Sequence, residues 1–136
     1  MPELKDYNIM ISHSWDYSTQ YQTVCGWLDS AKYFKWSNFS IPITNKVHTS
    51  DDQVLAEKIS NKIKLCHCII VLSGMYADYS EWMKYEMDTA IGFKVPIIGV
   101  EPWGQERVPS EVSNRATVMV GWNSASVINA VRNYAK

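Results

Sequence analysis

The stretch His67-Cys68-Ile69-Ile70-Val71-Leu72 is the most apolar segment of the chain, and it decides the fold. A strand that is apolar at nearly every position is expected where helices cover both faces of a sheet. Amphipathic segments lie on both sides of this run, with Ile59 and Ile63 before it and Met83 and Met87 after it. We therefore predict that residues 67–72 form a central strand of an α/β domain.

Further apolar segments alternate with helical patterns along the 136 residues. The patterns predict strands over 7–12, 38–41, 96–100 and 116–120, and helices over 18–32, 50–65, from Ser80 to about Gly92, and from Ser124 or Ser126 onward. Residues 101–114 are rich in proline, glycine and charge, which predicts a loop with at most one short turn of helix.

Strands that alternate with helices imply parallel pairing, because parallel neighbours need crossover connections. We expect one domain over residues 1–136 with a flavodoxin-like α/β fold. It is a three-layer sandwich in which a five-stranded parallel sheet of order 2-1-3-4-5 has helices on both faces. Ligands of such sheets bind beyond the carboxyl ends of the strands, near the point where the strand order reverses.

Composition narrows the class of protein. Hydrophobic residues make up 46% and charged residues 20%, which predicts a packed core. The net charge of −1 comes from well-mixed charges, so we expect no nucleic acid partner. No apolar run approaches the length of a membrane span, and no signal-peptide pattern is seen, so we expect no membrane association. Three cysteines, an odd number, fit a reduced, cytoplasmic protein.

Several kinds of site are excluded by missing residues. No glycine-rich phosphate loop follows the first strand, and no nucleophile elbow is present. A phosphoacceptor receiver needs acids after its first and third strands, where this chain has Ser12-His13 and Ser73. Alternation along a strand points Cys66 and Cys68 away from His67, so we interpret these cysteines as buried structural thiols and expect no metal site.

Glu86 is a candidate site residue whose setting depends on helical geometry. At about 100° per residue, Met83, Met87, Ala90 and Ile91 form one stripe that is expected to face the sheet. Glu86 then lies about 85° from the centre of that stripe, at the boundary between the buried and the solvent-exposed face of the helix. Geometry alone leaves two interpretations open: a solvated acid at the edge of a helix, or a partly desolvated carboxylate that a ligand can reach.

Two histidines also leave alternatives open. His13 follows the first strand, so it could contact a ligand or cap a helix. His48 lies in a polar segment before a predicted capping box, where an ordinary loop residue is the simpler interpretation.

Three segments, taken in order, resemble the signature segments of TIR domains. They are Ile9–Asp16 (IMISHSWD), Val71–Ala77 (VLSGMYA) and Ser80–Glu86 (SEWMKYE). Residues 38–42 (NFSIP) and 101–104 (EPWG) are similar to those of the TIR-like proteins of the bacterial Thoeris antiphage defence system. The resemblance covers essentially the whole chain.

The resemblance implies an enzyme that cleaves NAD at the nicotinamide–ribose bond, with NAD as substrate and no cofactor. The catalytic role of the family's Ser-x-Trp-x-x-x-Glu segment falls on Glu86. The residues expected to bind substrate are Ser12, His13, Ser14, Ile41, Pro42, His48, Ser73, Tyr76, Ser80 and Trp82.

The same resemblance implies a cyclic or related ADP-ribose second messenger that activates a separate effector, and possible self-assembly through TIR–TIR contacts. A non-catalytic TIR-type assembly or nucleotide-binding module is the alternative.

Overall fold

The computed structural model describes residues 5–12, 18–40, 52–73, 80–101 and 110–136. The elements in chain order are β1 (Asp6–Ser12), α1 (Ser18–Ser30), β2 (Lys35–Asn38), α2 (Asp52–Lys64), β3 (Cys68–Leu72), α3 (Ser80–Gly92), β4 (Ile97–Val100), α4 (Ser110–Arg115), β5 (Val118–Val120) and α5 (Ser124–Tyr134). The five strands form one sheet in which every neighbouring pair is parallel, in the order β2-β1-β3-β4-β5. The predicted flavodoxin-like fold is confirmed.

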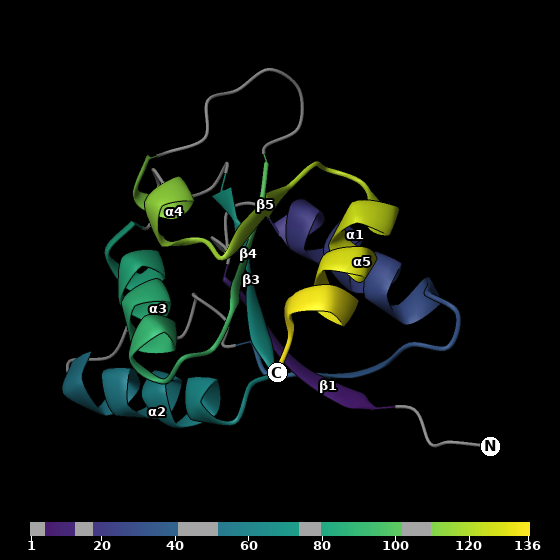
Figure 1. Ribbon diagram of the computed structural model, residues 1–136. Helices are drawn as coiled ribbons and strands as arrows, with labels where there is room; N and C mark the ends of the chain where they lie inside the picture. Colours follow the sequence, from purple (N-terminus) through teal and green to yellow (C-terminus); the bar gives the residue numbers. More distant parts are fainter. Residues whose placement is uncertain (1–4, 13–17, 41–51, 74–79, 102–109) are drawn as a thin grey trace.

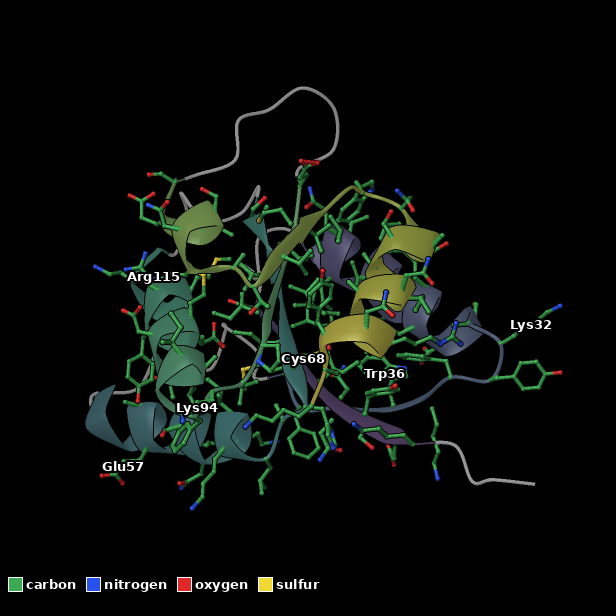
Figure 2. The ribbon with its side chains drawn as sticks, in the orientation of Figure 1. Lys32, Trp36, Glu57, Cys68, Lys94 and Arg115 are labelled. Atoms are coloured by element: carbon green, nitrogen blue, oxygen red, sulfur yellow. The ribbon has the colours of Figure 1, made fainter. Side chains whose placement is uncertain are left out.

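The sheet separates two helical layers (Figure 1): α2, α3 and α4 cover one face, and α1 and α5 cover the other. All five residues of β3 and all four of β4 are buried, as expected for strands covered on both sides. Cys68 lies inside the molecule, whereas Lys32, Glu57 and Lys94 point outward (Figure 2). Within the described ranges, no helix combines the length and apolarity needed to span a membrane.

The second strand differs from the prediction. We expected it at residues 38–41, but it spans Lys35–Asn38. After Asn38, the Phe39 amide still donates to the carbonyl of Ile9 at 2.8 Å, and the Ser40 hydroxyl accepts from the amide of Ile11 at 2.9 Å. A backbone bond thus continues the pairing as far as Phe39, and at Ser40 the side-chain hydroxyl takes the place of a backbone acceptor.

The other elements agree with the sequence patterns to within a few residues. The short helix predicted within 101–114 is α4, and its Arg115 forms an ion pair of 2.7 Å with Asp88 of α3. Asn123 caps α5, because its side chain accepts from the amide of Ser126 at 2.8 Å. The potential capping box that begins at Ser50 lies outside the described residues.

His67 joins β3 to β1 at the amino edge of the sheet. Its amide donates to the carbonyl of Asn8, and its Nδ1 accepts from the Asn8 amide at 2.8 Å. Nδ1 accepts only when it is unprotonated, so folding favours the neutral imidazole. Burial chiefly lowers the pKa of His67, with the charges of Lys5 and Lys136 adding to the effect and Asp6 opposing it.

This linkage predicts how stability depends on pH. The pKa of His67 is lower in the folded chain than its ordinary 6.5. The contribution of His67 to the free energy of unfolding is therefore complete above pH 6.5. The contribution is lost as the pH falls through the folded pKa, because the unfolded chain binds the proton first. His67→Asn keeps an acceptor but does not titrate. In urea unfolding between pH 7.5 and pH 5, the wild type should lose stability more steeply than His67→Asn, and parallel curves would contradict the assignment.

Candidate active site

The carboxyl ends of the central strands bring the candidate site residues together. Ser12 is the last residue of β1 and pairs with Val71 of β3. Ser73 follows β3 directly, and Leu72 pairs with Val100 at the end of β4. The strand order reverses between β1 and β3, because β2 lies on the other side of β1. This edge is the place where open parallel sheets bind ligands.

Helix α3 supplies the carboxylate at this edge. Met83, Met87 and Ala90 are fully buried, as the predicted stripe requires. Glu86 is also buried, with only 2% of its surface exposed, whereas Ile91 is 50% exposed. The expectation that Glu86 lies at the margin of the helix and that Ile91 faces the sheet is therefore wrong. Compared with the prediction, the buried face of α3 is rotated toward Glu86 and away from Ile91. Glu86 is therefore not a solvated acid at the edge of the helix.

The contact that accounts for this rotation is a hydrogen bond between Ser12 and Glu86. The Ser12 hydroxyl, which is fully buried, donates to Oε1 of Glu86 over 2.8 Å. A hydroxyl donated to a carboxylate offsets part of the solvation that the charge loses on burial. The bond also fixes the carboxylate over the end of β1. Ser12 therefore contacts the proposed catalytic group directly, a role that the sequence did not reveal.

Ser73 is fixed to the neighbouring strand. Its hydroxyl donates to the carbonyl of Val100 at 2.6 Å, and the side chain is fully buried. This bond joins the carboxyl ends of β3 and β4 beyond their last backbone pair. Contact of Ser73 with substrate stays a prediction.

Cys66 is a buried free cysteine whose thiol is influenced by the charge of Glu86. Its thiol donates to the carbonyl of Lys62 at 3.3 Å. Burial chiefly raises its pKa to about 12, and the negative charge of Glu86 acts in the same direction, while Met10 and Lys62 act against it. Burial likewise raises the pKa of Cys68 to about 12. Both thiols are therefore protonated at neutral pH and unsuited to act as nucleophiles, in agreement with a structural role.

The remaining predicted site residues lie outside the described part of the structure: His13, Ser14, Ile41, Pro42, His48 and Tyr76. Ser80 and Trp82 belong to the first turn of α3, and their side chains are also outside it. Their contact with substrate stays a prediction. Among the residues that are described, no group of three potential ligands could hold a metal ion.

The buried hydrogen bond predicts opposite effects of two substitutions on stability. Ser12→Ala leaves a buried carboxylate without its hydroxyl donor, so the free energy of unfolding should fall by about 1–3 kcal/mol. Glu86→Gln removes the buried charge but keeps an oxygen that can accept from Ser12, so stability should be equal or higher. Urea unfolding at pH 7.5 measures both.

Ser37→Ala is the matched control, because the Ser37 hydroxyl donates to a carboxylate oxygen of Asp6 at 3.0 Å in an exposed setting. Its effect should be within about 0.5 kcal/mol. If Ser12→Ala and Ser37→Ala lower the free energy of unfolding equally, the buried hydrogen bond contributes no more to stability than the exposed one.

Comparisons with known proteins concern the family and the fold of the chain. The model of the family "Thoeris protein ThsB, TIR-like domain" matches residues 10–107. A search among curated proteins finds no match. Among solved structures, the chain is similar to the CMP N-glycosidase BcmB of Clostridium botulinum, with a TM-score of 0.56 and 12% sequence identity over 92% of this chain and 98% of that chain.

The chain is also similar to a 3-dehydroquinate dehydratase-like protein from Bifidobacterium longum, with a TM-score of 0.51 and 10% identity over 96% of this chain and 94% of that one. At such low identity, both similarities show the fold alone. The family match covers most of the chain and includes Ser12, Ser73 and Glu86. This chain therefore belongs to the Thoeris ThsB family of TIR-like domains.

Proposed function

We propose that this protein cleaves the bond between nicotinamide and ribose in NAD, with Glu86 as the catalytic carboxylate. The observation that carries the proposal is the buried carboxylate of Glu86, held by the Ser12 hydroxyl at the switch point of a parallel sheet. Buried acids are costly, and they concentrate at functional sites. The family to which the chain belongs supports the same assignment.

The chemistry needs a fixed negative charge more than an acid. When the bond between the ribose carbon and the pyridinium nitrogen breaks, its electron pair leaves with nicotinamide, which becomes neutral. Positive charge then develops on the ribose, as in other glycosyl transfers. A carboxylate that is already oriented, as Glu86 is by Ser12, stabilises this charge without reorganisation. A solved structure with the same fold is named a CMP N-glycosidase, and the bond cleaved here would also be N-glycosidic.

The nucleophile that attacks the ribose determines the product. Water gives ADP-ribose, whereas a ring nitrogen or hydroxyl of the same molecule gives a cyclic product. Water and a hydroxyl lose a proton when they attack, whereas a ring nitrogen attacks through its lone pair and the base takes up the positive charge. We propose that the product is a second messenger in antiphage defence, which activates a separate effector, and that self-assembly accompanies the activity. Mass spectrometry of the product formed from NAD distinguishes the two routes.

The decisive experiment compares nicotinamide release from NAD by the wild type, Glu86→Gln and Glu57→Gln. Loss of the charge at residue 86 should reduce the rate by about 100-fold or more. Glu57 is an exposed acid on α2, so its substitution should leave the rate unchanged. The assay should be repeated at high protein concentration and with lysate of phage-infected cells, because TIR enzymes often act only when assembled or triggered.

Equal release by the wild type and Glu86→Gln under all these conditions would rule out the proposal. NAD that is retained by the protein without turnover would instead support the non-catalytic alternative.

A further inference from the structure

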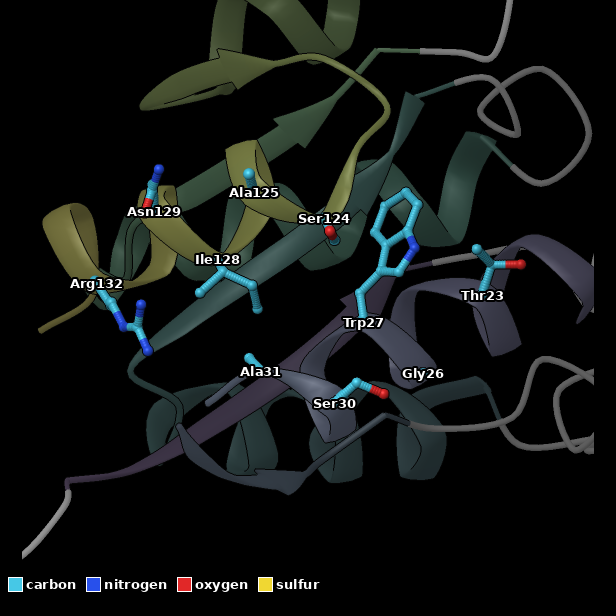
Figure 3. A pocket seen from close by; sticks show the side chains of 10 residues that line it. All are labelled: Thr23, Gly26, Trp27, Ser30, Ala31, Ser124, Ala125, Ile128, Asn129 and Arg132. Atoms are coloured by element: carbon cyan, nitrogen blue, oxygen red, sulfur yellow. The ribbon is translucent and has the colours of Figure 1, made fainter. Parts of the chain in front are cut away.

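Helices α1 and α5 lie side by side on the face of the sheet opposite α3, and a groove of about 500 Å³ runs between them (Figure 3). Sites for small molecules have volumes of roughly 300–1,000 Å³. The lining residues from Ser124 to Arg132 span eight helical steps of α5, so the groove is about 12 Å long. It is separated from Glu86 by the sheet and plays no part in the proposed NAD cleavage.

Gly26 lines this groove from α1. It lies in the interior of α1, where glycine costs about 0.5–1 kcal/mol relative to alanine. A Cβ at this position would meet no heavy atom within 4 Å, so the packing of the protein does not require glycine here. Because Gly26 lines the groove, the missing side chain leaves space that the helix itself does not use.

The groove has an aromatic group at one end. Trp27 lies at the end near Ser124 (Figure 3), and its ring packs edge-to-face against Trp122, with centroids 4.9 Å apart and planes at 61°. This contact fixes the indole while its side chain stays partly exposed. A fixed indole that borders an open groove can stack on a planar ring of a ligand.

A cation lies at the other end. One guanidinium nitrogen of Arg132 donates to the carbonyl of Lys32 at 2.7 Å, and Cζ is 5.6 Å from the ring centroid of Phe34. These contacts hold the exposed guanidinium in place, and toward the described residues they use one of its five donors. No carboxylate of the described ranges forms an ion pair with it. Arg132 is therefore prepared to bind an anion, and a phosphate matches its fork geometry.

We propose that the groove between α1 and α5 is a second ligand site, specific for a nucleotide. The base stacks on Trp27, and the phosphate binds Arg132. Ile128 and Ala31 lie between these ends (Figure 3). The hydroxyls of Ser30 and Ser124, which also line the groove, are the groups available to the ribose. The aromatic group and the cation lie at opposite ends of the groove, as the base and the phosphate lie at opposite ends of a nucleoside monophosphate.

The probe for this site is AMP, titrated into the intact chain by calorimetry and by NMR. AMP should bind the wild type and Glu86→Gln equally, because Glu86 lies on the opposite face. Arg132→Gln should weaken binding by about 10-fold or more through loss of the charge-assisted bonds. Gly26→Leu should abolish binding by filling the groove, while circular dichroism confirms the fold. Adenosine and ribose 5-phosphate should each bind more weakly than AMP.

Lys84→Gln, which removes an exposed cation from α3, is the matched control and should bind AMP as the wild type does. Three outcomes would overturn the proposal. They are absence of AMP binding at millimolar concentration, binding that Gly26→Leu leaves unchanged, and dimerisation in sedimentation that Gly26→Leu abolishes. The last outcome would mean that a second copy of the chain fills the groove. Binding is measured without turnover, so failure of NAD cleavage would not affect this test.

Discussion

The hydrogen bond between Ser12 and Glu86 is the constraint on which the site depends. It connects the end of the central strand β1 with a residue of α3 that lies 74 positions later in the chain. An ionised carboxylate loses much of its solvation when it is buried, so this position on α3 carries a cost in stability. Met83, Met87 and Ala90 show that apolar side chains pack well on the same face. Stability alone would select another apolar residue, and a functional reason for the acid is therefore expected.

The helix that carries this carboxylate is braced from both sides. The Tyr85 hydroxyl donates to the carbonyl of Ala56 on α2 at 2.9 Å, and Asp88 pairs with Arg115 of α4. Ser73 and Val100 hold the ends of β3 and β4 together at the same edge of the sheet. Catalytic groups that project from braced helices and strands keep their geometry better than groups on loops. The position of Glu86 is thus determined by the layer of α2, α3 and α4 as a whole.

Most of the fold could be predicted because the central strands are apolar throughout. β3 and β4 read as continuous apolar runs, and such runs between helical patterns leave few topologies other than a parallel sheet. β2 is the exception. It lies at the edge of the sheet and pairs on one side only. Its residues are exposed or only partly buried, so the strand does not need a continuous apolar sequence. Pairing through the Ser40 hydroxyl could not be seen in the pattern, and the predicted strand was placed three residues too late.

The site shows where hydrophobic patterning stops being informative. A helical wheel counts apolar residues, so it assigned Ile91 to the inner face and left Glu86 at the margin. The actual inner face contains Glu86 because a buried donor, the Ser12 hydroxyl, lies opposite it. That donor comes from a distant strand, and no local window of sequence contains both partners. Only the resemblance to TIR domains connected the segments that carry Ser12 and Glu86. A pattern of residues can thus predict which surface is buried, but a buried charge is predictable only when its partner is known.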